Sequence, residues 1–403
     1  MRIALVTIDF PPFRTSAAVQ MRDLAIELRR QGHEPVVFVP ASGLGRTWHL
    51  ETQEGVEILR LDVVGTRNVG YVRRALGEFL LPFGMLRSLR GSPHEHTRWD
   101  GVVWYSPTIF FGPFVRALKK RSHCRGYLIL RDVFPEWAVD LGLLRKGLAY
   151  WLLKAVATFQ YSVADVIGVQ THSNKVYLER WARRGPRRLE VLQNWLAIAP
   201  DVGSSINVAA TALAGRKIFV YAGNMGVAQG MDVLLELAFR LAHRTDIGFL
   251  FVGRGSEYER LSREAADLRL DNVLFFNEIQ PTEIPGLFAQ CHVGLLVLDP
   301  RHKSHNIPGK FLTYLQAGLP VLAKVNPGTD LIRVIEGEGV GLAYAGDSVE
   351  EFARLAGDLA DNSGAHATFA RRGRELGKRM FAPESAAEQI CRGLGASRST
   401  TQE

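Results

Sequence analysis

Short apolar segments alternate with segments of helical periodicity along most of this chain. Arg2–Ile8 is a run typical of a buried strand, and Ser16–Gln31 carries apolar residues at helical spacing up to Gly32. Parallel strands need a helical crossover between them, so this alternation is typical of βαβ units around a parallel sheet. The pattern therefore predicts an α/β fold with doubly wound sheets.

The alternation occurs twice, in two series of strands. In the first half, further strands are expected at Pro35–Val39, Val56–Leu61, Gly101–Trp104, Gly126–Leu130 and Val163–Val169, with a helix near Pro113–Lys120. In the second half, strands are expected at Lys217–Ala222, Phe249–Val252, Val273–Phe276, Val293–Leu298, Val321–Ala323 and Gly341–Tyr344, with helices at Met231–His243 and Glu257–Asp267. Two successive doubly wound domains are the simplest architecture.

The division between the two series falls where the chain becomes irregular. Residues 197–215 are small and lack periodicity, which is typical of a linker between domains. We expect a first Rossmann-like domain at residues 1–195, a linker at 196–216 and a second such domain at 217–382. Residues 383–403 are expected to form a helix that packs back toward the first domain, followed by a disordered tail.

Composition excludes several classes of protein. The chain has 403 residues, of which 47% are hydrophobic and 22% charged, and it has only three dispersed cysteines. These are ordinary values for a cytosolic globular protein, and they exclude a disulfide scaffold and a mainly disordered chain. The apolar run near the N-terminus is too short for a signal peptide, and no run reaches the length of a membrane span.

Positive charge is concentrated in the first half. Residues 1–195 hold 28 Lys and Arg against 17 Asp and Glu, a net +11, whereas the whole chain carries +8. Such a field indicates an anionic partner, which is a nucleic acid, an acidic lipid or a phosphorylated substrate.

Glycines and polar residues follow two strands of the second series. Gly223, Asn224 and Gly226 come after the first strand, and Gln229 stands at the following helix start. Such a turn lets the backbone approach a phosphate, although it also occurs as an ordinary βα turn. Arg254 follows the next strand, where it could pair with a phosphate or face solvent. Tyr258 replaces the third glycine of a dinucleotide fingerprint, which disfavours NAD.

Lys310 occupies the first turn of a predicted helix. It lies in the stretch His305–Val321, where a loop enters a helix that ends at Gly318. A cation at a helix N-terminus opposes the helix dipole, so a bound anion would compensate it. The alternative is a solvated surface lysine.

Carboxylates follow two strands of the first series. Asp132 and Glu136 come after the strand at Gly126–Leu130, where a carboxylate can accept a proton or bind a sugar hydroxyl. The alternatives are a helix cap for Asp132 and a capping or surface carboxylate for Glu136. Asp9 follows the first strand, where it could contact an acceptor or solvent, and we rank it below Asp132. The expected acceptor-binding residues are Asp9, Ser16 and Asp132. HExxH, Walker A, GxSxG and DxD patterns are absent, and His172 and His305 are expected to be structural or polar lining rather than metal ligands.

The ordered set of these motifs resembles the GT-B sugar transferases of glycosyltransferase family 4. More narrowly, it is similar to the bacterial subgroup that adds amino sugars such as N-acetyl-L-fucosamine to O-antigen or capsule. The matching segments are the first strand with Phe10–Pro12, Leu24–His33, Asp132–Glu136, Asn194–Trp195, Gly223–Gly230 and Pro308–Val321.

The resemblance implies two Rossmann-like domains that face each other across a cleft. The second domain would hold a nucleotide sugar, usually UDP-linked, and the first would hold the acceptor. Such enzymes retain anomeric configuration and generally need no metal. The expected donor-binding residues are Gly223, Asn224, Gly226, Gln229, Arg254, Lys310 and Thr313, and the expected catalytic residues are Asp132, Glu136 and Lys310.

The chain departs from the family at four positions. Many members have Arg and Lys where this chain has Asn224 and Gln229, so the diphosphate would be met by backbone N–H groups, Arg254 and Lys310. Many also have two glutamates where this chain has His305 and Thr313, and the second of them commonly binds ribose.

Two segments of the first half combine basic and large apolar residues. They are residues 67–90 and Leu143–Tyr161, and both are typical of an interfacial segment on acidic lipid, or else of core helices with basic outer faces. The leading interpretation is thus a retaining glycosyltransferase that acts on a polyprenyl-diphosphate-linked saccharide at the cytoplasmic face of the bacterial inner membrane. The alternatives are a sugar-nucleotide 2-epimerase and a non-enzymatic nucleic-acid-binding protein, although no RNA motif or helix-turn-helix is visible.

Overall fold

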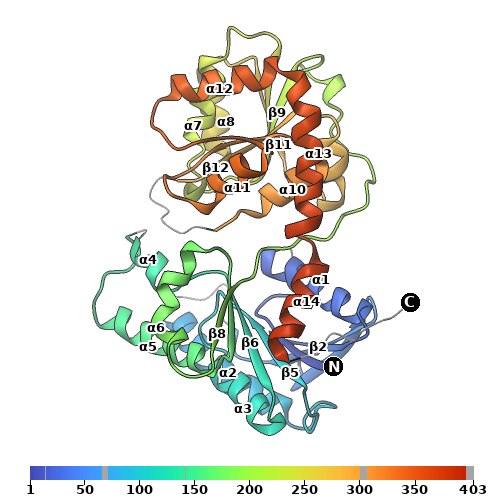
Figure 1. Ribbon diagram of the computed structural model, residues 1–403, viewed down its shortest axis with the longest axis vertical. Helices are drawn as coiled ribbons and strands as arrows, with labels where there is room; N and C mark the ends of the chain where they lie inside the picture. Colours follow the sequence, from blue (N-terminus) through green and yellow to red (C-terminus); the bar gives the residue numbers. More distant parts are fainter. Residues whose placement is uncertain (14, 66–70, 141, 300–305, 396–403) are drawn as a thin grey trace. The chain divides into compact units, whose positions relative to one another are not determined.

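The computed structural model describes residues 1–13, 15–65, 71–140, 142–299 and 306–395, and among these it leaves out the side chains of 71–75, 228 and 363 (Figure 1). The chain divides into two compact units. The first comprises Met1–Leu196 together with Ala382–Glu403, and the second comprises Ala197–Phe381. The expected disordered tail lies outside the described residues.

An eight-stranded sheet forms the centre of the first unit, in the order β3-β4-β2-β1-β5-β6-β7-β8. Every neighbouring pair is parallel except β3 with β4. The strands are β1 (Arg2–Val6), β2 (Glu34–Ala41), β3 (Trp48–Gln53), β4 (Val56–Asp62), β5 (Gly101–Tyr105), β6 (Arg125–Leu130), β7 (Val166–Val169) and β8 (Arg188–Val191). Because the central strands are buried on both faces, they are almost wholly apolar, as parallel strands of this kind are.

Helices cover both faces of this sheet (Figure 1). They are α1 (Ser16–Arg30), α2 (Tyr71–Leu89), α3 (Gly112–Ser122), α4 (Glu136–Asp140), α5 (Leu148–Val163), the 3₁₀ helix η1 (Ser173–Leu178), α6 (Glu179–Ala182) and α14 (Pro383–Leu394). The last of these returns from the end of the chain and packs against α1 and β6. Gln389 on α14 donates hydrogen bonds to the Glu190 carboxylate (2.9 Å) and to the Val191 carbonyl (2.8 Å), which ties the helix to β8.

The second unit has a six-stranded parallel sheet in the order β11-β10-β9-β12-β13-β14. Its strands are β9 (Lys217–Asn224), β10 (Ile247–Arg254), β11 (Val273–Asn277), β12 (Val293–Val297), β13 (Val321–Lys324) and β14 (Gly341–Tyr344). Its helices are η2 (Val208–Ala210), η3 (Val227–Gln229), α7 (Asp232–Arg240), α8 (Tyr258–Asp267), η4 (Pro281–Glu283), α9 (Ile284–Phe288), α10 (Gly309–Ala317), α11 (Asp330–Glu338), α12 (Val349–Asp361) and α13 (Ser363–Met380).

The segment expected to be a linker packs on the second unit. The Ser205 N–H donates to a carboxylate oxygen of Glu283 (2.7 Å), and the Val208 N–H donates to the side-chain oxygen of Gln290 (2.8 Å). These bonds engage polar backbone groups that an extended linker would leave to water.

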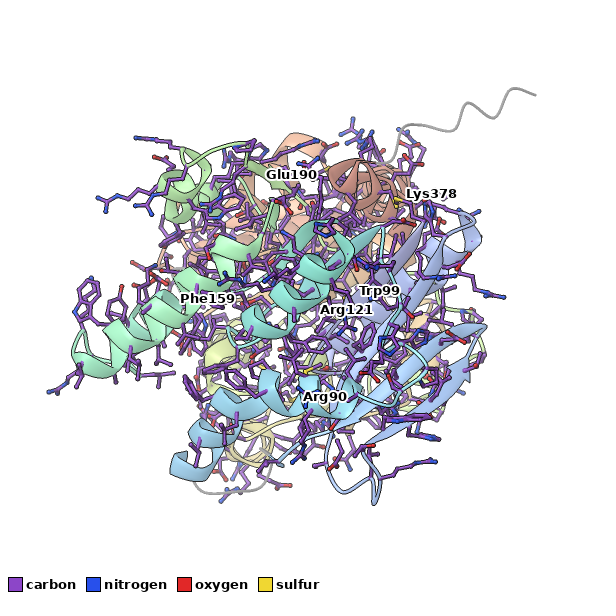
Figure 2. All side chains as sticks on the ribbon, turned by 90° about the horizontal axis from the view of Figure 1, so that it is seen from below. Arg90, Trp99, Arg121, Phe159, Glu190 and Lys378 are labelled. Atoms are coloured by element: carbon purple, nitrogen blue, oxygen red, sulfur yellow. The ribbon has the colours of Figure 1, made fainter. Side chains whose placement is uncertain are left out.

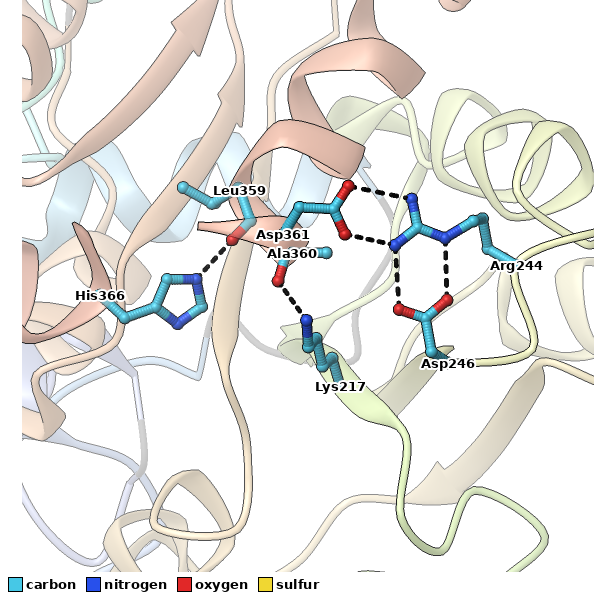
Figure 3. Close-up of polar contacts among 7 residues, drawn as sticks. All are labelled: Lys217, Arg244, Asp246, Leu359, Ala360, Asp361 and His366. Carbon is cyan, nitrogen blue, oxygen red and sulfur yellow. Dashed lines mark hydrogen bonds and ion pairs between the residues drawn. The ribbon is translucent and has the colours of Figure 1, made fainter. Parts of the chain in front are cut away.

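The amino-terminal edge of the second sheet is held by the C-terminus of α12 (Figure 3). Lys217, the first residue of β9, donates to the Ala360 carbonyl (2.5 Å), and His366 donates to the Leu359 carbonyl (2.6 Å). Arg244 pairs with Asp246, just before β10, and with Asp361 at the end of α12. Cations at a helix C-terminus satisfy its last carbonyl groups and favour its dipole. This edge of the sheet is therefore occupied by structural contacts.

Sequence periodicity located most strands but not all of their limits. The strand expected at Val163–Val169 begins only at Val166, since Val163 is the last residue of α5. The edge strands β3 and β8 were not expected. Both lie at a sheet edge and carry partly exposed polar residues, so they lack the apolar run that marks a buried strand.

Candidate functional site

Glycines let β9 and β10 approach each other closely at their carboxyl ends. Gly223 and Gly253 are paired in register and both have positive φ, +142° and +156°. A Cβ at residue 253 would lie 1.9 Å from the Gly223 carbonyl oxygen, and no side chain fits at that distance. Open α/β sheets bind ligands at this edge, so the glycines shape the floor of a candidate site.

Lys310 reaches the same place from the first turn of α10. Its Nζ lies 4.7 Å from the centre of the Tyr221 ring, and a Cβ at Gly223 would be 3.2 Å from it. Burial lowers the pKa of the Lys310 ammonium to about 8, and no carboxylate of the described residues pairs with it. The strand end and the helix start thus bring together Gly223 and a cation that the electron-rich face of Tyr221 supports.

Gln229 organises the turn after β9. Its side-chain oxygen accepts hydrogen bonds from the Gly226 N–H (3.0 Å) and from the Asn224 side-chain amide (3.1 Å). The Met225 N–H donates to the Arg254 carbonyl (2.7 Å). The expectation that the backbone N–H groups of this turn are open to a phosphate is therefore wrong for Met225 and Gly226, because both are engaged within the protein.

Arg254 ends β10 next to Asn224, its partner in register on β9. Its side chain is 74% exposed, and its Nε lies 3.0 Å from a carboxylate oxygen of Glu278. Asn224, Arg254 and Lys310 therefore lie at the same carboxyl edge as Gly223. They provide an amide and two cations, groups that suit a phosphorylated ligand.

Thr313 lies one turn after Lys310 on α10, and its hydroxyl donates to the Lys310 carbonyl (2.8 Å). Because its proton is used within the helix, the hydroxyl can only accept a hydrogen bond from a ligand. The other family position that departs from glutamate, His305, lies outside the described residues.

Asp9 and Ser16 lie at the carboxyl end of β1 and at the start of α1. The Asp9 carboxylate is buried and accepts a hydrogen bond from the hydroxyl of Thr15 (2.9 Å), the N-cap of α1. Ser16, the first residue of the helix, is exposed. The structure therefore places both residues at one edge of the first sheet, with the hydroxyl of Ser16 accessible.

Asp132 and Glu136 follow β6 in the first unit and differ in their surroundings. Asp132 is half-buried beside the fully buried Arg131. It precedes α4 by several residues, so it is not the N-cap of that helix. Glu136 is the first residue of α4 and forms an ion pair with Lys154 on α5. The pair satisfies one of its carboxylate oxygens, while the other is buried without a hydrogen bond in the described structure.

A buried network that was not expected from the sequence lies behind Asp132. Arg131 donates to the Leu192 carbonyl (2.7 Å), and its guanidinium lies 4.8 Å from the centre of the Trp195 ring. The Trp195 N–H donates to the Gln20 carbonyl (2.7 Å), and Tyr105 donates to the Gln20 side chain (3.0 Å). The network gives Asn194–Trp195 a structural role in supporting the loop after β6. The feature of the sequence that could have revealed this network is an arginine directly after an apolar strand.

Among the residues that the structure describes, no group of three or more His, Cys, Asp or Glu side chains could hold a metal ion. Independence from metal therefore stays a prediction. Within the same residues, no helix is long and apolar enough to cross a membrane.

Residues 216–362 match the family model described as "Glycosyl transferases group 1". The chain is 26% identical over 241 residues to "Probable glycosyltransferase WbjE" of Pseudomonas aeruginosa, a match that covers 58% of this chain and 59% of that protein. It is 26% identical over 377 residues to "Putative colanic acid biosynthesis glycosyl transferase WcaI" of Escherichia coli, covering 87% and 90%.

Two solved structures share the fold over nearly the whole chain. Sucrose-phosphate synthase of Thermosynechococcus elongatus superposes with a TM-score of 0.71 at 16% identity, covering 97% of this chain and 98% of that one. Anabaena HepE in complex with UDP superposes with a TM-score of 0.67 at 15% identity, covering 98% and 99%. These matches identify the chain as a glycosyltransferase of the GT-B fold. The predicted fold class and enzyme class are both confirmed.

Proposed function

We propose that this glycosyltransferase takes a sugar from a UDP-linked donor, bound at the carboxyl edge of its second sheet, and transfers it to a saccharide acceptor with retention of configuration. The observation that carries the proposal is the Lys310 ammonium beside Gly223, without a carboxylate partner among the described residues. A diphosphate supplies the negative charge that this cation lacks. The complex of HepE with UDP supports the choice of nucleotide.

The chemical step breaks the bond between the sugar anomeric carbon and the β-phosphate oxygen, and both electrons of that bond go to UDP. The acceptor hydroxyl oxygen forms the new bond on the same face, and its proton passes to the departing phosphate oxygen. Charge develops on the diphosphate as the bond breaks, so Lys310 and Arg254 stabilise the transition state more than the ground state. We propose that this reaction needs no metal ion.

We assign Asp132 to the orientation of the acceptor. It is half-buried at the end of β6, and the Arg131 network behind it fixes the backbone from which it projects. Glu136 is held by Lys154 and its second carboxylate oxygen is buried, so we assign it to the support of α4 against α5 rather than to contact with the acceptor. Asp9 and Ser16 bind acceptor hydroxyl groups at the end of β1, which lies at the same carboxyl edge of the sheet as the end of β6.

The relatives and the surface of the first unit support the acceptor class that we propose. WcaI is described as a colanic acid biosynthesis enzyme, which supports a role in bacterial surface polysaccharide synthesis, either O-antigen or capsule. The motif resemblance supports an N-acetylated amino or deoxy sugar as the transferred group, and a polyprenyl-diphosphate-linked saccharide as the acceptor.

Exposed apolar side chains on two helices support a membrane-bound acceptor. Helix α2 buries Leu81, Met85 and Leu89 on one face, yet its other side is apolar as well. Helix α3 contacts both α2 and α5, and Figure 2 shows the amino-terminal parts of α2 and α5 on the same side of the first unit. The exposed residues, which we call the α2–α5 surface, are Leu76, Phe79, Leu80 and Phe83 on α2 and Leu148, Trp151 and Leu152 on α5.

Such a surface suits the boundary of an anionic bilayer. Each of the two helices exposes several large apolar side chains, and the exposed Arg145 and Lys146 lie just before α5. Large apolar side chains exposed in groups often mark sites that bind a protein or a membrane. Apolar insertion combined with basic residues is the pattern of interfacial binding. We therefore propose peripheral attachment to the inner face of the bacterial cell membrane, with the bulk of the enzyme in the cytoplasm.

The test is a product analysis with the full chain. Purified protein is incubated with a panel of UDP- and GDP-sugars, with and without a polyprenyl-diphosphate saccharide, and the anomeric configuration of the product is read by NMR. We expect UDP and a glycosylated product only when donor and acceptor are both present. Conversion of UDP-GlcNAc alone to an epimer would instead identify an epimerase, and turnover of GDP-sugars alone would overturn the choice of UDP.

A further inference from the structure

Arg254 and Glu278 form an ion pair at the edge of the candidate donor site. Arg254 ends β10 and Glu278 directly follows β11. Gly253 and Asn277 are paired in register, so Arg254 and Glu278 are the next residues along the two adjacent strands. The Arg254 Nε lies 3.0 Å from a Glu278 carboxylate oxygen.

Arg254 can readily exchange the carboxylate of Glu278 for another anion. The Arg254 side chain is 74% exposed and that of Glu278 is 37% exposed, and ion pairs in such surroundings are weak because water and salt screen them. The backbone of Arg254 is fixed, by contrast, since its carbonyl accepts the Met225 N–H and its strand pairs with Asn224. The guanidinium can therefore change partner while its attachment point stays beside Asn224.

We propose that Glu278 competes with the donor diphosphate for the guanidinium of Arg254. Glu278 holds this guanidinium while the donor site is empty and takes it back when UDP leaves. The inference rests on the proposed function, since the anion that displaces Glu278 is the donor diphosphate. A carboxylate offers Arg254 one negative charge in a screened position, whereas a diphosphate offers more charge and several oxygens. Glu278 thus weakens the binding of donor and product alike, and it limits how long UDP stays on the enzyme.

Removing the charge of Glu278 should strengthen UDP binding, whereas removing an ordinary binding residue weakens it. Glu278→Gln keeps the size and the polar character of the side chain but removes its charge. Arg254 is then free for the ligand, and we expect UDP to bind about 2- to 5-fold more tightly, as expected from the strength of exposed ion pairs. Arg254→Gln should weaken UDP binding, and in that background Glu278→Gln should have no effect.

The experiment is a double-mutant cycle on UDP affinity, measured by calorimetry on the full-length protein. The variants are Glu278→Gln, Arg254→Gln and both together. Glu375→Gln is the matched control, since Glu375 pairs with Arg371 at the same 3.0 Å on an exposed part of α13. Thermal unfolding is measured for each variant to check that it is folded. We expect Glu278→Gln to tighten UDP binding only when Arg254 is present, and Glu375→Gln to leave the affinity unchanged.

The other outcomes separate the two proposals. Equal tightening with and without Arg254 would show that Glu278 acts only through its general charge, and weaker binding in Glu278→Gln would make Glu278 a ligand contact. Either result would overturn the competitor role while leaving the donor site intact. A wild-type protein that binds no UDP would instead contradict the proposed function.

Discussion

The ammonium group of Lys310 lies 4.7 Å from the centre of the Tyr221 ring, in space that the missing side chain of Gly223 leaves open. The contact joins the start of α10 to the end of β9, although Tyr221 and Lys310 are 89 positions apart in the chain. A cation in the first turn of a helix is unfavourable by itself, and burial adds to that cost. The position is consistent with a residue kept for binding an anion.

Replacing Lys310 should reduce catalysis more than it reduces folding stability. Lys310→Ala removes a cation from the charge that develops on the diphosphate, and we expect kcat to fall by about 100-fold or more. Lys310→Arg keeps the charge and should retain part of the activity. Steady-state kinetics with saturating donor measure both. Wild-type kcat in Lys310→Ala would remove this residue from the mechanism.

Donor affinity should depend on pH through the same lysine. Burial lowers the pKa of Lys310 to about 8, so the ammonium loses its proton as pH rises through that value. UDP affinity should then be level near pH 7 and fall above about pH 8, by up to tenfold per pH unit. In Lys310→Arg the guanidinium stays charged, and the fall should disappear from this range. Calorimetric titrations across the range measure it, and an identical fall in both proteins would assign the effect to another group.

The stability of the unliganded enzyme should change in the opposite direction. The pKa of Lys310 is lower in the folded chain than its ordinary value of 10.5, so the unfolded chain binds this proton more tightly between the two values. The contribution of Lys310 to the free energy of unfolding therefore rises as pH increases from about 8 to about 10. Urea unfolding of wild type and Lys310→Met over this range isolates the contribution as their difference. A difference that does not change with pH would contradict the lowered pKa.

Gly253→Ala should disrupt the donor site at its floor. The new Cβ would lie 1.9 Å from the Gly223 carbonyl oxygen, at a backbone φ of +156°, so the ends of β9 and β10 must separate. We expect a loss of several kcal/mol in the free energy of unfolding, as for other overpacked sites with strained backbone, together with loss of UDP binding. Chemical denaturation and calorimetry measure the two effects.

Gly337→Ala is the matched control for that change. Gly337 lies within α11, and a Cβ there would meet nothing within 4 Å. Alanine is favoured over glycine in a helix interior by about 0.5–1 kcal/mol, so this variant should be slightly stabilised and should bind UDP normally. Equal tolerance at both positions would show that the close approach of β9 and β10 is not required.

Membrane attachment should depend on the α2–α5 surface. Phe79→Ser with Phe83→Ser removes two exposed rings from α2, and Trp151→Ser removes one from α5. Both changes should reduce cosedimentation with vesicles of phosphatidylglycerol by about tenfold or more, since burying each ring in lipid is worth about 1.5–3 kcal/mol. Phe239→Ser, at an exposed ring on α7 of the second unit, should leave binding unchanged.

High salt provides a second readout of the same surface. Release of wild-type protein from the vesicles by salt would show that basic residues assist the apolar contact, as we expect. Equal vesicle binding by all variants would contradict the assignment of this surface.

The fold was largely predictable because buried parallel strands have a clear signal in the sequence. Central strands such as β5 and β12 are buried on both faces and are therefore continuous apolar runs. Edge strands such as β3 give no such run, because one side of each faces water. The start of β7 was placed too early because Val163 and Ala164, which are the last residue and the C-cap of α5, are apolar like the strand that follows Asp165.

The candidate site was predictable in its residues but not in its contacts. The glycines at the end of β9 and Lys310 have signals that depend on local sequence, namely a tight turn and a cation in the first turn of a helix. Gln229 accepting the Gly226 N–H, and Glu278 pairing with Arg254, depend on side-chain directions that no periodicity encodes. The support that Arg131 gives to Trp195 joins segments more than sixty residues apart, and one sequence does not reveal such a pairing.

The central claim is that Lys310 and its neighbours on the second unit hold a nucleotide diphosphate, and the most direct measurement is a calorimetric titration of UDP into the full-length protein in the presence of EDTA. We predict that the wild type binds UDP without metal and that Lys310→Ala binds it at least about tenfold more weakly. Equal affinities in the two proteins, or UDP binding that EDTA abolishes, would contradict the account.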